Sequence, residues 1–220
     1  MDQRVFLARV KRQLATPAPP NPAHPMPPMP ATVPEVHSHL LDPHDLAGSF
    51  ERAAKAVSAE VHRVNGAEVP PELIAELVER YDVKRAVISV EPEAAAVGAE
   101  LRALAVEVEP LTIEAAARAD LGVTSATYGL ATTGTVVQES AVAGGRTASL
   151  LPPVHLCVLP ASRLVPSTSN VLRGLGEPGR LPSNLVLITG PSRSGDIEQI
   201  ITLGVHGPTA LHIVLLEGSG

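Results

Sequence analysis

Residues 211–216 read LHIVLL, an apolar run in which His212 is the single polar residue. Runs of about four to eight apolar residues without polar alternation are typical of strands buried on both faces, as in a parallel sheet. Similar short runs recur, with helical or Gly/Pro segments between them, at residues 86–90, 122–124, 134–137, 155–159 and 185–189. We therefore expect an α/β fold, with an open, mostly parallel sheet flanked by helices.

Three helices are expected between residues 42 and 104. The dipeptide Asp42-Pro43 predicts a helix start, because a capping carboxylate precedes a proline whose missing N–H costs nothing there. Leu46, Phe50, Ala54, Val57 and Val61 would continue this helix on one face. Pro70 and Pro71 open a second helix, and residues 93–104 form a third.

Composition restricts the function. The chain has 220 residues, 45% of them apolar, which suits one α/β domain with a short extension. A net charge of −6 and only four Phe and Tyr residues argue against a nucleic-acid surface. Cys157 is the only cysteine, so no disulfide or cysteine-ligated iron–sulfur cluster is expected within this chain. No run approaches membrane-spanning length or a signal peptide, which predicts a cytoplasmic protein without a membrane span.

The N-terminal region is predicted to lie apart from the domain. Residues 1–16 carry Leu7, Val10 and Leu14 at helical spacing and form an expected amphipathic helix. Residues 17–35 hold nine prolines, which neither helix nor sheet tolerates, and read as an extended linker. The predicted α/β domain then occupies residues 36–220.

Two glycine motifs and two histidine groups are set aside. The turn GPSRSG at residues 190–195 has phosphate-loop spacing, but Asp196 stands where that loop needs lysine. The sequence GLGEPG at 174–179 follows no strand run and is a poor dinucleotide fingerprint. His37, His39, Asp42 and His44 read as solvated polar residues. His62 and His212 read as isolated, with His212 a strand residue making an ordinary hydrogen bond, so no metal site is predicted.

Three small polar turns remain as a candidate anion site: residues 131–135 (ATTGT), 190–194 (GPSRS) and 204–208 (GVHGP). Hydroxyls and glycines allow close backbone approach, and Arg193 can pair with a carboxylate or phosphate. The backbone after Arg193 is expected to enter a helix near Ser194 or Gly195. The first two turns are expected at the carboxyl ends of parallel strands, where such sheets bind ligands. Asp196 would stabilise the helix start or pair with an arginine.

Three blocks resemble a known family. They are ADLGVTSATYGLATTGTVV at 119–137, SLLPPVHLCVLP at 149–160, and LVLITGPSRSGDIEQIITLGVHGPTALHIVLL at 185–216. Together they are similar to the lactate-utilization protein C family, built on the LUD domain. The resemblance implies a fold like those of sugar-phosphate isomerases and coenzyme A transferases. It also implies a role in oxidising L-lactate to pyruvate beside sibling subunits that carry iron–sulfur clusters.

The family signature, carried over position by position, falls on Thr133, Gly134, Thr135, Gly190, Pro191, Ser192, Arg193, Asp196, Glu198, His206, Gly207 and Pro208. One departure is Thr132, where the family often has an acid, and this puts a general base at that spot in doubt.

A small-carboxylate or phosphate site is therefore predicted from Thr133, Gly134, Thr135, Gly190, Ser192, Arg193 and Asp196, with His206 as a candidate proton or hydrogen-bond donor. No cofactor is expected in this chain. Two alternatives stay open: a stand-alone enzyme acting on an acyl-CoA or sugar phosphate, and an assembly protein whose turns are only structural.

Overall fold

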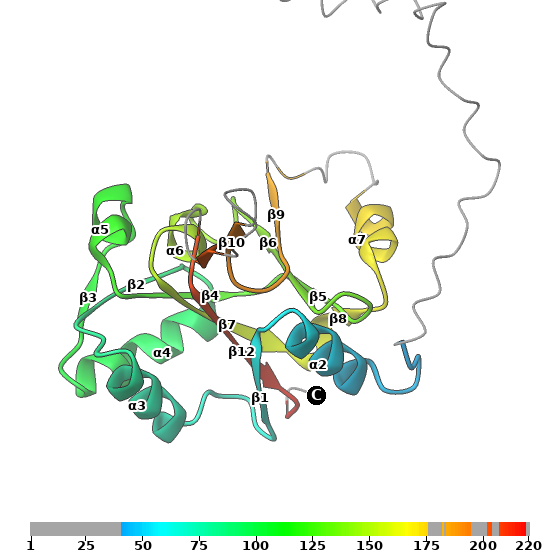
Figure 1. Cartoon of the computed structure of the whole chain (residues 1–220), viewed down its shortest axis with the longest axis horizontal. Helices are drawn as coiled ribbons and strands as arrows, with labels where there is room; N and C mark the ends of the chain where they lie inside the picture. The colour runs from blue at the N-terminus through cyan, green and yellow to red at the C-terminus, as the bar shows by residue number, and fades with distance from the viewer. Residues whose placement is uncertain (1–40, 176–181, 183, 195–201, 204–206, 219–220) are drawn as a thin grey trace, which may run out of the picture. The chain divides into compact units, whose positions relative to one another are not determined.

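A parallel six-stranded sheet organises the part of the chain that the computed structural model describes, residues 41–175, 182, 184–194, 202–203 and 207–218 (Figure 1). The strand order is β1-β12-β7-β4-β2-β3, and every neighbouring pair is parallel. The strands span Glu60–Val64 (β1), Arg85–Ile88 (β2), Glu107–Glu109 (β3), Leu121–Ser125 (β4), Val154–Pro160 (β7) and Ala210–Leu216 (β12). The predicted α/β fold with a parallel sheet flanked by helices is confirmed.

Helices cover both faces of this sheet. Their bounds are Leu46–Ala56 (α2), Pro71–Arg80 (α3), Pro92–Ala103 (α4), Ile113–Arg118 (α5) and Thr147–Leu150 (α6). A further helix, Thr168–Leu175 (α7), packs instead on strands outside this sheet. Side chains of α3 and α4 pack on one face of β4, β7 and β12, while Phe50 and Ala54 of α2 pack on the other face. No helix within the described ranges is long and apolar enough to cross a membrane. The N-terminal helix and linker predicted for residues 1–35 lie outside those ranges.

A second, four-stranded sheet takes up two of the predicted runs. It has the order β8-β5-β6-β9, with β5 at Tyr128–Leu130, β6 at Thr135–Glu139, β8 at Leu164–Val165 and β9 at Leu185–Ile188. The β5–β6 and β6–β9 pairs are antiparallel. Only residues 131–134 join β5 to β6, and a parallel crossover needs about a dozen residues. The short connection therefore forces a hairpin rather than a strand of the parallel sheet.

The first helix is shorter than predicted. Asp45, not Asp42, is its N-cap, and its carboxylate accepts a hydrogen bond from the Gly48 amide at 2.8 Å. The helix ends at Ala56, and Ser58 then adopts the left-handed conformation at φ 67°. Such a residue turns the chain away from the helix axis. The prediction that Val61 continues the helix is therefore wrong, because Val61 belongs to β1.

The strand order reverses between β2 and β4. From β2 the chain moves outward to β3, and it then returns to the opposite side of β2 to form β4. In open parallel sheets, ligands bind outside the carboxyl ends of the strands at such a reversal. The relevant ends here are Ile88 of β2 and Ser125 of β4. This position is the first place in the fold to look for a site.

Candidate functional site

Several predicted site residues do lie together, beside the C-terminal end of α2. The hydroxyls of Thr133 and Thr135 are 2.7 Å apart, and Thr135 is in turn 2.7 Å from the hydroxyl of Thr189. This chain of hydroxyls links the β5–β6 turn to the end of β9. A helix C-terminus carries partial negative charge, which does not favour an anion.

The two glycines of this group serve packing. A Cβ atom at Gly134 would lie 2.1 Å from the Ala54 nitrogen, and one at Gly190 would lie 2.4 Å from the Val57 carbonyl oxygen. Both glycines also have positive φ, at 63° and 82°. Only glycine combines this conformation with so close an approach to another backbone. At both points the neighbour is α2 or the residue that ends it.

Arg193 does not precede a helix at the next residue. Arg193 and Ser194 form the short strand β10, which pairs with β11 (Thr202–Leu203), so the helix start predicted at Ser194 is wrong. The alternative start, Gly195, lies outside the described residues, as do Asp196 and His206. The Arg193 guanidinium donates a hydrogen bond to the Ser58 hydroxyl, just after α2.

The 190–194 turn lies at the opposite end of the parallel strands from the end that was predicted. The Ser192 amide donates to the Pro208 carbonyl at 2.8 Å, two residues before β12 begins. The neighbouring Thr209 amide donates at 2.8 Å to the carbonyl of Pro153, which directly precedes β7. These are the amino ends of the strands. The prediction of a carboxyl-end position is wrong, because β9 belongs to the second sheet.

A pocket of about 260 Å³ lies instead at the reversal of strand order. Its walls come from the segment after β2, the segment after β4, and the 3-10 turn Ala161–Arg163 that follows β7. The lining residues are Glu91, Pro92, Glu93, Ser125, Ala126, Thr127, Val142 and Arg163. The size suits a small metabolite, and the lining combines one cation, two acids and two hydroxyls.

Arg163 is held firmly in this pocket. One terminal nitrogen donates to the Ser125 hydroxyl at 3.0 Å and to the Ala126 carbonyl at 2.9 Å, and the other donates to the Glu93 carboxylate. A guanidinium has five N–H donors, so these three bonds leave two without a partner among the described residues. The side chain is 35% exposed, which keeps it accessible from the pocket.

Glu91 is the unusual acid of the pocket. It is 8% exposed, and one of its carboxylate oxygens has no hydrogen-bond partner among the described residues. One oxygen of Glu93 is in the same situation. Burial raises the pKa of Glu91 above its ordinary value. The folded protein therefore favours a protonated, neutral carboxyl more than water does.

Replacing Glu91 with Gln should stabilise the fold by about 1 kcal/mol at pH 7, because the substitution removes a buried, incompletely paired charge. A raised carboxyl pKa contributes stability at low pH that is lost as the pH rises. The gain should therefore be smaller at pH 4 than at pH 7. Thermal unfolding of both proteins at pH 7 and pH 4 measures this, with exposed Glu68→Gln as the control. An equal gain at both pH values would contradict the charge explanation.

The sequence held a signal for part of this pocket. The acids of Glu91-Pro-Glu93 stand between the predicted strand at 86–90 and the predicted helix at 93–104, which is the carboxyl end of a parallel strand. Arg163 had no such signal, because its partner Glu93 is 70 residues away in the sequence.

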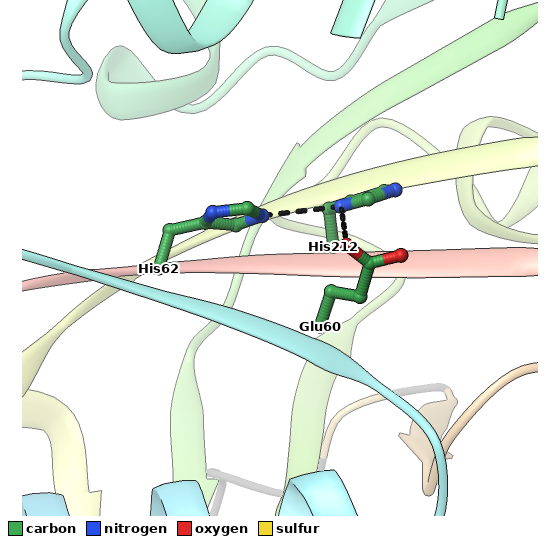
Figure 2. Close-up of side chains that lie close together, drawn as sticks. All are labelled: Glu60, His62 and His212. Carbon is green, nitrogen blue, oxygen red and sulfur yellow. Dashed lines mark hydrogen bonds and ion pairs between the residues drawn. The ribbon is translucent and has the colours of Figure 1, made fainter. Parts of the chain in front are cut away.

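His62 and His212 are not isolated, contrary to the sequence prediction. His62 Nε2 lies 3.1 Å from His212 Nδ1, and Glu60 Oε2 lies 3.8 Å from the same Nδ1 (Figure 2). These three side chains are the one group within the described ranges whose atoms are placed to hold a metal ion. The prediction missed them because it placed Val61 on a helix, where alternate residues do not share a face.

Comparison with known proteins gives consistent matches. Residues 47–216 match the model of the LUD domain. Over 111 residues the chain is 45% identical to lactate utilization protein C of Halalkalibacterium halodurans, covering 48% of this chain and 47% of that protein. Over 109 residues it is 38% identical to lactate utilization protein C of Bacillus subtilis, covering 48% and 45%. The chain thus spans about half the length of the curated relatives it matches.

A solved structure supports the fold. The crystal structure of a DUF162 family protein from Deinococcus radiodurans matches with a TM-score of 0.59 at 22% sequence identity. The match covers 80% of this chain and 99% of that one. The family model covers most of the chain, from α2 through β12. The chain belongs to the LUD domain family.

Proposed function

We propose that this chain takes part in lactate utilization, as a subunit that supports oxidation of L-lactate to pyruvate. The observation that carries the proposal is the 36–45% identity, over nearly half of the chain, to several proteins named lactate utilization protein C. The pocket at the strand reversal adds a place of suitable size for a small metabolite.

The electrons of this reaction would pass to partner subunits that carry iron–sulfur clusters. Cys157, the only cysteine, is fully buried, and burial raises its pKa to about 12. A thiol in this state is a poor metal ligand, since the thiolate is the binding form. This supports a division of labour in which the present chain binds a small molecule or a partner, and the redox centres lie elsewhere.

The ligand is a small carboxylate held by Arg163. The two remaining N–H groups of this guanidinium can donate charge-assisted hydrogen bonds to one carboxylate. Two ionised acids beside one arginine would repel an anion. The raised pKa of Glu91 reduces this repulsion, because the protonated carboxyl is neutral and can donate a hydrogen bond. Carboxylate binding should therefore be accompanied by proton uptake and weaken as the pH rises.

Ligand binding by paired variants tests this assignment. L-Lactate or pyruvate should raise the melting temperature of the wild type, because a ligand that binds only the folded state stabilises it. Arg163→Lys keeps the charge but loses the planar fork and should bind about tenfold more weakly. Glu91→Gln should bind more tightly at pH 8. Arg85→Lys, on an arginine 48% exposed outside the pocket, is the matched control.

The competing positions are distinguished in the same assay. Loss of binding in Arg193→Lys with retention in Arg163→Lys would move the carboxylate to the 190–194 turn. The absence of any shift with lactate, pyruvate, phosphate or coenzyme A would contradict a ligand role and favour the assembly protein.

The cellular role needs partner evidence. Full-length protein should co-purify with iron–sulfur subunits, and its deletion should abolish growth on L-lactate. Removal of residues 1–34 tests whether the predicted helix and linker are required for that association. Turnover of coenzyme A esters or sugar phosphates by the purified chain alone would contradict the accessory role and favour the stand-alone enzyme.

A further inference from the structure

The parallel register of β1 and β12 places Glu60, His62 and His212 on one face of the sheet edge. Glu60 stands directly beside His212, and His62 is two residues further along β1. Because strand side chains alternate between faces, Glu60 and His62 share a face with each other and with His212. Figure 2 shows the side chains of Glu60 and His62 close to that of His212, with His212 joined to each by a dashed line.

The spacing of the three side chains suits the binding of one shared metal ion. Bonds of about 2.0–2.1 Å at tetrahedral angles place two zinc ligands about 3.3 Å apart. Here the separation is 3.1 Å between His62 Nε2 and His212 Nδ1, and 3.8 Å between His212 Nδ1 and Glu60 Oε2. All three ligand atoms lie within 4.8 Å of one another. Only small side-chain adjustments would bring them onto one ion.

Tyr81 orients the buried histidine. Its hydroxyl lies 2.9 Å from His212 Nε2, the ring nitrogen that faces away from His62. When the hydroxyl accepts a hydrogen bond from the Nε2–H group, the lone pair of Nδ1 points toward His62 and Glu60. Metal-binding histidines are usually held in this way by a partner on the second ring nitrogen.

Histidine suits a metal site at neutral pH. An imidazole of ordinary pKa, about 6.5, is mostly neutral at pH 7, and neutral imidazole is the metal ligand. The side chain of His212 is fully buried, whereas His62 and Glu60 remain partly exposed. An ion could therefore enter from the β1 side.

One cation competes for this position. Arg80 donates to both oxygens of Glu60, at 2.7 and 2.8 Å, from a side chain that is 46% exposed. A carboxylate can keep one oxygen on Arg80 and give the other to a metal ion. The positive charge of Arg80 would nevertheless weaken cation binding. Removing this charge should therefore strengthen metal binding, whereas removing a ligand should weaken it.

We propose that Glu60, His62 and His212 form a three-ligand site for a divalent transition metal ion of the zinc type. Two imidazole nitrogens and one carboxylate are a common zinc ligand set, and a tetrahedral ion would keep its fourth position for water or another ligand. The site lies on β1 and β12, away from the residues that line the strand-reversal pocket. It therefore does not depend on the proposed lactate role.

Calorimetry with Zn²⁺ alone, on full-length protein stripped with chelator, tests the site. The His37→Gln/His39→Gln background removes the other closely spaced pair, which could bind zinc independently. We expect one zinc ion per chain and a raised melting temperature. His62→Gln should weaken binding at least about tenfold, and Tyr81→Phe about tenfold through its effect on His212.

Two further variants separate metal binding from general stability. Arg80→Gln removes an ion pair yet should bind Zn²⁺ several-fold more tightly, which a purely structural role would not predict. His44→Gln, on an exposed histidine outside the cluster, should bind like the background protein. Undiminished binding in His62→Gln, weaker binding in Arg80→Gln, or no binding in the background protein would each overturn the proposal. The circular dichroism spectrum of each metal-free variant establishes that it is folded.

Discussion

Lowering the pH from 6.5 toward 4 should destabilise the folded chain steeply, because His155 and His212 resist protonation. Burial lowers the pKa of His155 to about 3 and that of His212 to about 4, from an ordinary value of 6.5. A depressed histidine pKa gives stability that is complete above pH 6.5 and is lost as the pH falls toward the folded value. Each such proton costs at most about 1.4 kcal/mol per pH unit, so the two together approach about 3 kcal/mol per unit.

Urea denaturation at intervals between pH 5 and 8 measures this slope. The window stays above the range in which the carboxylates with lowered pKa values, Glu51 and Glu60, take up protons. Burial of Glu91 acts in the opposite direction, since its raised pKa favours the folded state at lower pH. A flat profile between pH 5 and 6.5 would contradict the assignment of neutral, buried histidines.

His155→Gln isolates one of the two contributions. In the wild type, His155 Nε2 lies 2.8 Å from the Thr124 hydroxyl, which also accepts a hydrogen bond from Gln138 of β6. His155 Nδ1 has no partner in the described part of the chain. The variant should be less stable at pH 7 because this buried contact is altered, yet its slope below pH 6.5 should be about half that of the wild type.

Local sequence patterns predicted the strands well where both faces of the strand are buried. The runs at 155–159 and 211–216 are central strands β7 and β12, buried throughout by helices on either side. The strand at 60–64 was missed because β1 lies at the sheet edge and its sequence EVHRV carries three charged or polar residues. It also follows the first helix after only three residues, so the helical pattern appeared to continue through it.

The candidate site was harder to predict because its contacts are long-range. The Thr-Gly-Thr turn was predicted to allow close backbone approach by a ligand, and the Gly-Pro-Ser-Arg turn to present Arg193 to an anion. The sequence could not show that the approaching backbone is α2 rather than a ligand, because Gly134 and Ala54 are far apart along the chain. The histidine cluster was missed for the same reason. His62 and His212 are 150 residues apart in the sequence and meet only because β1 pairs with β12.

Replacing Gly134 with Ala should reduce the free energy of unfolding by about 3–5 kcal/mol, which is near the upper end for a single substitution. The new Cβ would lie 2.1 Å from the nitrogen and 2.3 Å from the Cα of Ala54, so a backbone segment must move. The left-handed conformation at φ 63° adds a further cost of about 1 kcal/mol for any residue with a Cβ. Neither strain can be relieved by a side-chain rotation.

Urea denaturation of Gly134→Ala and Gly174→Ala makes the comparison direct. A Cβ at Gly174, on α7, would meet no atom within 4 Å, and alanine there should be neutral or stabilising by up to about 1 kcal/mol. The two explanations for Gly134 then predict different losses. If the glycine is needed for packing against α2, Gly134→Ala loses stability in the absence of any ligand. If it is needed for a ligand instead, the variant unfolds like the wild type and loses only binding, and the packing explanation is wrong.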